Sequence, residues 1–129
     1  MLKSIDPILN ADVLCALRAM GHGDDLVICD MNFPADATAR QTVLGRLLRI
    51  DNVTADRAAR AILSVLPLDS FVDKPALRME IVGKPAEVPP VQIEVQRETV
   101  PDRELGPICG EELVGHSDSV GDAESKFAV

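Results

Sequence analysis

Apolar and polar residues at the start of the chain follow two patterns, one helical and one extended. The helical spacing is carried by Val13, Leu14, Leu17 and Met20. Asn10 stands ahead of them as an N-cap, and Gly21 follows as the residue that ends the helix. The unbroken apolar run Leu26–Cys29 is short, which is typical of a strand buried on both faces in a parallel sheet.

The rest of the chain adds further candidate elements. We expect a loop over Asp36–Gln41 and a strand over Val43–Ile50. A helix should run from Thr54 to Pro67, which ends it, with Arg57 and Arg60 facing outward. A strand is expected over Leu77–Val82. Val91–Val95 alternates like a strand, although Gln92–Arg97 also fits a helix. A short helix over Ser119–Lys126 and the start of a strand at Phe127 complete the pattern. Helices that alternate with strands predict an α/β fold over residues 1–129: a single three-layer domain with a largely parallel sheet flanked by helices.

Composition and charge exclude several function classes. The net charge is −8, and residues 91–129 carry nine acidic and three basic side chains. This balance argues against nucleic acid and against an anionic membrane surface as partners, because both require a basic face. No apolar stretch approaches the length of a membrane span, and the N-terminus lacks the pattern of a signal peptide. We interpret the acidic excess as a contribution to solubility.

The three cysteines predict a reducing environment. Cys15, Cys29 and Cys109 have neither a paired nor a metal-like spacing. Cys15 belongs to the helical pattern and Cys29 to the apolar run, so we expect buried free thiols. This fits a cytoplasmic location.

Two polar residues flank the first predicted strand and are candidates for chemistry. Because an imidazole gives and takes protons near neutral pH, His22 can act as an acid or a base, or it can cap the C-terminus of the preceding helix. Asp30 ends the strand, where chemistry gathers in α/β folds, and it can also be a turn residue. In a functional role, its carboxylate would orient His22 or bind a ligand from a partly dry site. For Asp24 we favour a cap on the loop through backbone N–H groups.

Other kinds of site are poorly supported by the sequence. His22, Asp24, Asp30 and His116 have no standard ligand spacing, so we expect no metal. Gly21-x-Gly23 follows a helix and precedes a strand, which is the wrong order for a dinucleotide fingerprint. No nucleophile elbow is present, and Cys29 lies in an apolar run where a thiol is inert.

Several motifs in the N-terminal part of the chain resemble those of a known family. The matching motifs are Met1-Leu2-Lys3, Ile5-x-Pro7, Gly21-His22-Gly23-Asp24 and Asp30-x-Asn32-Phe33-Pro34-Ala35. Together they resemble the family of L-fucose mutarotase and D-ribose pyranase, of the fucose mutarotase type. The likeness is dense to Ala35, looser to Phe71 and thin beyond.

The resemblance implies an isomerase that exchanges sugar anomers by acid–base ring opening and closure, without a cofactor. It places His22 and Asp30 in the catalytic site, and Asp24, Asn32, Phe33 and His116 among the residues that bind a monosaccharide. It also implies a homo-oligomer with shared active sites, to which a Tyr-Gly-Asn-like segment contributes. That segment would follow Val129, and the sequence contains no Tyr. We therefore expect the sequence to be part of a longer chain, the alternative being a member that has lost part of the site. The alternatives are pyranose–furanose interconversion of D-ribose, sugar binding without catalysis, and a structural or interaction role.

Overall fold

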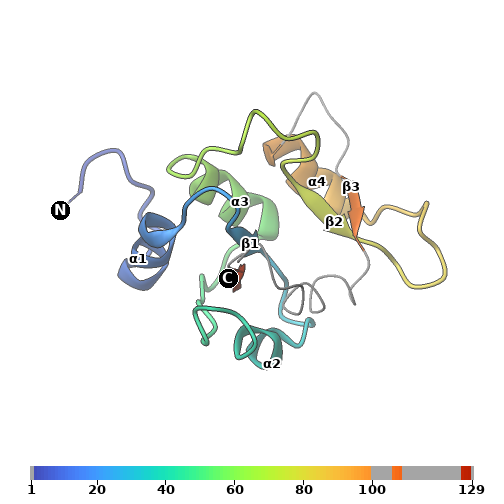
Figure 1. The fold of residues 1–129 in the computed structure, drawn as a ribbon, viewed down its shortest axis with the longest axis horizontal. Coiled ribbons are helices and arrows are strands. Elements are labelled where there is room, and N and C mark those ends of the chain that lie inside the picture. Colours follow the sequence, from blue (N-terminus) through green and yellow to red (C-terminus); the bar gives the residue numbers. More distant parts are fainter. Residues whose placement is uncertain (1, 100–105, 109–125, 129) are drawn as a thin grey trace.

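The computed structural model describes residues 2–99, 106–108 and 126–128 of the chain. In these ranges the elements are α1 (Ala11–Ala19), β1 (Asp25–Val27), α2 (Ala35–Ala39), α3 (Ala55–Leu63), β2 (Leu77–Met79), α4 (Pro90–Thr99), β3 (Gly106–Ile108) and β4 (Lys126–Ala128). Helices α1 and α3 lie beside β1, and β2, β3 and α4 gather on the side away from α1 (Figure 1). The described residues thus form one small domain of helices and strands, and the predicted succession of α1, β1, α3 and β2 is confirmed.

Helix α1 begins and ends where the sequence predicts. The Oδ1 atom of Asn10 accepts a hydrogen bond of 3.0 Å from the backbone N–H of Val13, which satisfies one of the free donors of the first turn. Met20 is the C-cap and Gly21 follows it. The positive φ that often ends a helix appears instead at Gly23, where φ is 85°. Glycine's conformational freedom is therefore used inside the turn that follows the helix.

An apolar cluster, the α1–α3 core, joins these two helices. Its buried members are Leu9, Val13, Ala16, Leu17, Leu48, Ala61 and Ile62. Val13 and Ile62 are the largest side chains that are fully buried, which fits a chain with three Phe and neither Trp nor Tyr. Met20 and Leu66, which follow the ends of α1 and α3, pack against this core. The segments that leave both helices are thus tied to the same apolar cluster.

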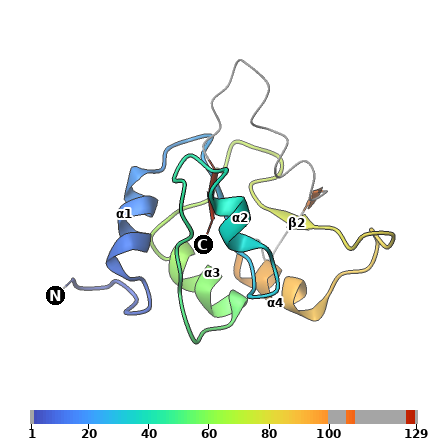
Figure 2. The ribbon, with the colours of Figure 1, turned by 90° about the horizontal axis from the view of Figure 1, so that it is seen from below.

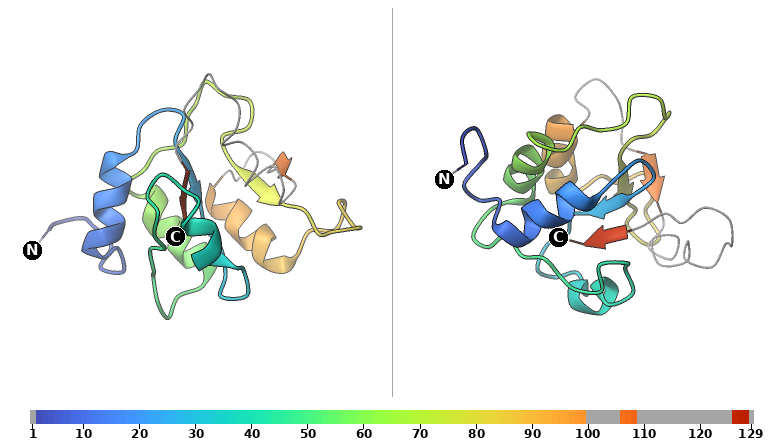
Figure 3. Two further views of the ribbon diagram at one scale, coloured as in Figure 1. Left: turned by 60° about the horizontal axis from the view of Figure 1, so that its bottom comes forward. Right: turned by 60° about the vertical axis from the view of Figure 1, so that its left-hand side comes forward.

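The described strands form two parallel pairs. Leu26 of β1 lies opposite Phe127 of β4, and Arg78 of β2 lies opposite Pro107 of β3. Figure 3 shows β1 and β4 side by side, with α3 on one side of the pair and α2 on the other. The parallel sense and the strand at Phe127 are as predicted. β2 ends at Met79, earlier than expected, and the apolar residues of β1 are half-buried instead of buried on both faces.

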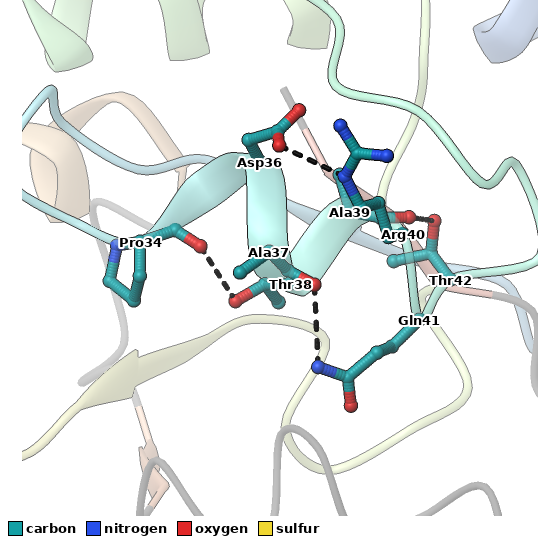
Figure 4. Close-up of polar contacts among 8 residues, drawn as sticks. All are labelled: Pro34, Asp36, Ala37, Thr38, Ala39, Arg40, Gln41 and Thr42. Atoms are coloured by element: carbon teal, nitrogen blue, oxygen red, sulfur yellow. Dashed lines mark hydrogen bonds and ion pairs between the residues drawn. The ribbon is translucent and has the colours of Figure 1, made fainter.

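The predicted loop over Asp36–Gln41 is wrong, because α2 covers most of it. Side chains of the segment hold this short helix by bonding to nearby carbonyls and to one another (Figure 4). The Thr38 hydroxyl donates to the carbonyl of Pro34 at 3.1 Å, and Arg40 Nε donates to Asp36 Oδ2 at 3.0 Å, one turn apart. Small polar residues suggested a loop, yet these local bonds stabilise a helical turn.

The predicted strand over Val43–Ile50 is also wrong, because the segment forms turns and irregular chain. Gly45 has a φ of 69°, which breaks an extended backbone. Leu48 is buried in the α1–α3 core, and Leu44 and Ile50 pack against it. The apolar residues of this stretch therefore fill the core without strand pairing.

For the segment after Pro89, the helical alternative is right and the strand over Val91–Val95 is wrong. Helix α4 starts at Pro90, a residue favoured in the first turn because it needs no backbone partner. The Gln92 side chain donates to the Met79 carbonyl at 2.9 Å and so joins α4 to β2. The short helix expected over Ser119–Lys126 lies outside the described residues, except that Lys126 begins β4.

An ion pair links α3 to α4, which lie side by side (Figure 2). Arg60 donates to both carboxylate oxygens of Glu98, from Nε at 2.8 Å and from Nη2 at 2.5 Å. The guanidinium lowers the pKa of Glu98, and the carboxylate raises the pKa of Arg60. Arg57, expected on the outer face, is instead half-buried and donates to Asp6 at 2.6 Å.

Replacing Glu98 tests this pair through its pH dependence. Because the folded-state pKa of Glu98 lies below its ordinary value of 4.5, the ionised form stabilises the fold above that pH. This contribution is lost as the pH falls through the lower native value. We therefore expect the melting temperature of the wild type to fall more steeply than that of Glu98→Gln between about pH 5 and pH 3. Glu94→Gln, at an exposed position of the same helix, should follow the wild type, and a common slope for all three proteins would contradict the pairing.

Candidate functional site

The segment between α1 and β1 is a closed turn with His22 at its surface. The backbone N–H of Gly21 donates to Asp24 Oδ2 at 2.7 Å, and the N–H of Asp24 donates to the Gly21 carbonyl at 3.2 Å. Gly23 supplies the positive φ, and apart from its chain neighbours no described residue lies within 4 Å of where its Cβ would stand. The side chain of His22 is 80% exposed. Asp24 thus caps the loop, which is the interpretation favoured from the sequence.

Two residues from a distant segment contact the imidazole of His22. The Nδ1 atom lies 2.8 Å from Oδ1 of Asp69, which is 47 positions further along the chain. The ring of Phe71 meets the imidazole edge to face, with centroids 5.3 Å apart and an angle of 73° between the planes. Both partners follow α3, in the segment that leaves the α1–α3 core at Leu66.

Asp30 lies beyond the other end of β1 and holds a turn of its own. Its Oδ1 atom accepts a hydrogen bond of 2.9 Å from the N–H of Asn32, and its carbonyl accepts one of 3.2 Å from the N–H of Phe33. The residue is exposed, so the partly dry environment expected for its carboxylate is wrong. Among the described residues His22 bonds to Asp69, and the expected orienting bond from Asp30 is not formed.

The structure therefore divides the predicted site residues between two turns. His22 and Asp24 share the turn before β1, while Asp30, Asn32 and Phe33 share the turn after it. Asn32 is exposed and Phe33 is half-buried. His116 lies outside the described residues.

Sequence reasoning missed Asp69 and Phe71. No role is predicted for these two residues from the sequence, and no spacing rule links them to His22. One available signal was composition, because an aromatic residue is rare in this chain and Phe71 stands in a polar segment with an acid two positions before it.

The two cysteines of the described ranges differ in exposure. Cys15 and Cys29 are free thiols, but Cys15 is exposed on α1 instead of buried, and Cys29 is half-buried. Burial, with the charge of Asp30 nearby, raises the pKa of the Cys29 thiol. A protonated thiol is a poor nucleophile, which makes Cys29 a weak candidate for covalent chemistry. Cys109 lies outside the described residues.

Other potential binding features lie away from this site. Over the described ranges, no group of three or more His, Cys, Asp or Glu side chains is arranged to hold a metal ion. An open groove of about 320 Å³ lies at the N-terminal end of α1, with the lining residues Asn10, Asp12, Leu47, Leu48, Arg49 and Asp51. None of the candidate site residues lines it. Among the helices described, none has the length and apolar character needed to cross a bilayer.

The arrangement around His22 suits proton transfer. An imidazole can give and take a proton near neutral pH, and a carboxylate on one ring nitrogen orients it. Among the described residues, nothing beyond the chain neighbours lies within 4 Å of a Cβ placed on either of the glycines that flank His22. A small polar molecule can therefore reach the exposed edge of the imidazole.

The chain is similar to several known proteins. Fucose mutarotase of Homo sapiens is 37% identical over 86 residues, which are 67% of this chain and 54% of the human protein. The chain thus spans about half the length of the curated relatives it matches. Among solved structures, protein Atu2016, named as a candidate sugar binding protein, has 49% identity and a TM-score of 0.85, covering 99% of this chain and 85% of that one.

A second solved structure carries a sugar. Fucose mutarotase from Streptococcus pneumoniae in complex with L-fucose has 26% identity and a TM-score of 0.73, with 98% of this chain and 86% of that chain covered. The family model described as the RbsD / FucU transport protein family matches residues 3–124. The chain therefore belongs to the RbsD/FucU family.

Proposed function

We propose that this protein is a mutarotase that interconverts the anomers of L-fucose or a similar monosaccharide, with His22 as its acid–base group. The observation that carries the proposal is the exposed imidazole of His22, which bonds to Asp69 through Nδ1 on a turn flanked by glycines. The names of the relatives support the substrate class, since the human and the pneumococcal proteins are called fucose mutarotases.

The reaction requires little more than positioned proton transfer. A base takes the proton from the anomeric hydroxyl, the bond between the anomeric carbon and the ring oxygen breaks, and an acid protonates that oxygen to give the open aldehyde. Rotation and the reverse steps close the ring as the other anomer. In our proposal His22 takes and returns the hydroxyl proton, and solvent at this exposed turn supplies the proton for the ring oxygen. Acid–base assistance of this kind contributes about 10²- to 10⁴-fold, and the chemistry uses no cofactor.

The second turn supplies the remaining contacts in this proposal. Asp30 and Asn32 present polar groups that can bind sugar hydroxyls, and Phe33 shapes the pocket next to them. Asp24 binds substrate in addition to holding its own turn, and His116 adds a basic group. These roles follow the resemblance of the motifs, and the exposure of Asp30 and Asn32 is compatible with them.

We further infer a cytoplasmic homo-oligomer with active sites shared between subunits. Large apolar side chains are exposed beside the candidate site residues: Met31, between Asp30 and Asn32, is 95% exposed, and Phe71, against His22, is 71% exposed. A subunit contact at the site would cover them.

The free thiols of Cys15 and Cys29 support a reducing compartment. The parallel sense of the pairs β1–β4 and β2–β3 supports a three-layer fold with largely parallel strands, although the described residues arrange these strands as two separate two-stranded sheets.

Sugar binding without catalysis is the second candidate function. The specific observation in its favour is the structural likeness to protein Atu2016, which at 49% identity is named as a candidate sugar binding protein and not as an isomerase. A binding protein would retain affinity for the sugar without accelerating anomer exchange.

Replacing the histidine separates the two functions. We expect His22→Ala to reduce the catalysed exchange of L-fucose anomers by about 10²- to 10⁴-fold, because the acid–base group is removed. Saturation-transfer NMR measures this exchange directly. Arg18→Ala, on the exposed face of α1, is the control and should exchange anomers at the wild-type rate. Undiminished exchange in folded His22→Ala would refute the role of this residue, and a wild type that binds fucose without faster exchange would favour sugar binding alone.

Two replacements of Asp30 separate its charge from its turn. Asp30→Asn keeps an oxygen that can accept from the Asn32 N–H, so the melting temperature should change little. It removes a charge worth about 1.5–3 kcal/mol in a hydrogen bond to substrate, so exchange should slow by roughly ten- to a hundred-fold. Asp30→Ala also removes the turn acceptor and should lower the melting temperature. If Asp30→Asn loses stability but keeps full exchange, Asp30 is a turn residue and not part of the site.

The assembly is tested by sedimentation. We expect equilibrium sedimentation of the wild type to give an oligomer, and dilution below its dissociation constant to reduce exchange per chain, because each site would lose its partner's residues. Met31→Glu, which places a charge at the exposed position beside Asp30, should favour the monomer. A monomer with full activity per chain would contradict shared sites.

A further inference from the structure

We infer that Asp69 is the positioning residue of His22 and makes Nε2 the nitrogen that exchanges protons with the sugar. The inference rests on the proposed function for its catalytic consequence. Its structural part, the tautomer of the His22 ring, rests on the contact between His22 and Asp69 alone.

The direction of the hydrogen bond follows from the chemistry of its two groups. A carboxylate at neutral pH has no proton to donate, so Oδ1 of Asp69 accepts and Nδ1 of His22 donates, across 2.8 Å. In a neutral imidazole one nitrogen carries the proton and the other carries a lone pair. With the proton held on Nδ1, the lone pair is on Nε2. Nε2 is then the base that can take the proton of an anomeric hydroxyl.

A second contact fixes the plane of the same ring. Phe71 meets the imidazole at 73° and 5.3 Å, in the edge-to-face arrangement that aromatic rings prefer. A histidine side chain that is 80% exposed would otherwise be free to rotate about both of its side-chain bonds. Asp69 holds one nitrogen and Phe71 holds the ring plane, so the position of Nε2 is defined before a substrate arrives.

The ion pair between His22 and Asp69 contributes little to the stability of the fold. His22 is 80% exposed and Asp69 is 31% exposed, and ion pairs at such positions are screened by solvent. The loss of Asp69 should therefore leave the melting temperature nearly unchanged. Its effect should appear in the tautomer of His22 and in kcat, which depend on the orientation of the ring.

The test replaces Asp69 and reads the ring directly. Nitrogen-15 NMR distinguishes the two imidazole tautomers, and the chain has only two histidines, so His22→Gln identifies the His22 signals by difference. We expect the proton on Nδ1 in the wild type and on Nε2 in most molecules of Asp69→Ala. The kcat for fucose anomer exchange should fall roughly two- to five-fold, the factor that a weak surface pair can supply, with KM nearly constant.

Two further variants keep the result interpretable. Asp69→Asn preserves the size of the side chain, and its amide can donate to Nδ1, so it should also move the ring proton to Nε2 and lower kcat. Asp73→Ala removes an exposed acid from the same segment, one that pairs with no residue in the part of the chain described, and it should change neither the tautomer nor kcat.

The outcomes separate this inference from the proposed function. An unchanged tautomer in Asp69→Ala and Asp69→Asn would overturn the role of Asp69, even if the wild type is an active mutarotase. A changed tautomer with an unchanged kcat would overturn its role in catalysis. A changed tautomer in a protein whose wild type does not accelerate anomer exchange would uphold the positioning of His22 and overturn the proposed function.

Discussion

The burial of apolar side chains between α1 and α3 is the constraint on which the rest of this structure depends. Val13 and Ile62 are the largest fully buried side chains of this core, and Ala16 and Ala61 belong to it as well, in a chain that has few aromatic residues. Met20 and Leu66 extend the same core past the ends of the two helices. The turn with His22 and the segment with Asp69 therefore leave the core as neighbours, although they are far apart in the sequence.

This arrangement explains how an exposed site is built in a small domain. Polar side chains at the surface have no core packing to hold them, so local bonds must do so. Asp24 closes the turn below His22, and Asp69 and Phe71 hold the imidazole from the side. The backbone beneath the site is anchored by apolar burial, while the reactive group remains open to solvent. Both conditions suit a base that must meet a small, highly hydrated substrate.

The sequence predicts local features of this protein better than distant ones. Asn10 as N-cap, the helix up to Met20 and the capping role of Asp24 follow from short-range patterns and are confirmed. The strand predicted over Val43–Ile50 is wrong, because side chains that fill a core must be apolar but can come from a backbone of any conformation. The strand predicted from the alternation in Val91–Val95 is wrong, because Pro90 and the packing between α3 and α4 favour a helix. The contact between Asp69 and His22 was not predicted, because it depends on tertiary packing, which no spacing rule contains.

The central claim is that the segments leaving α1 and α3 form one sugar site around the imidazole of His22. The most direct measurement is an NMR titration of the wild type with L-fucose, which follows the ring signals of His22 and Phe71 together with the backbone amides of the protein. The account predicts that these two rings and the amides of the Gly21–Asp24 turn shift together and saturate with a single dissociation constant. Saturable binding that shifts signals elsewhere and leaves the His22 ring unchanged would contradict it.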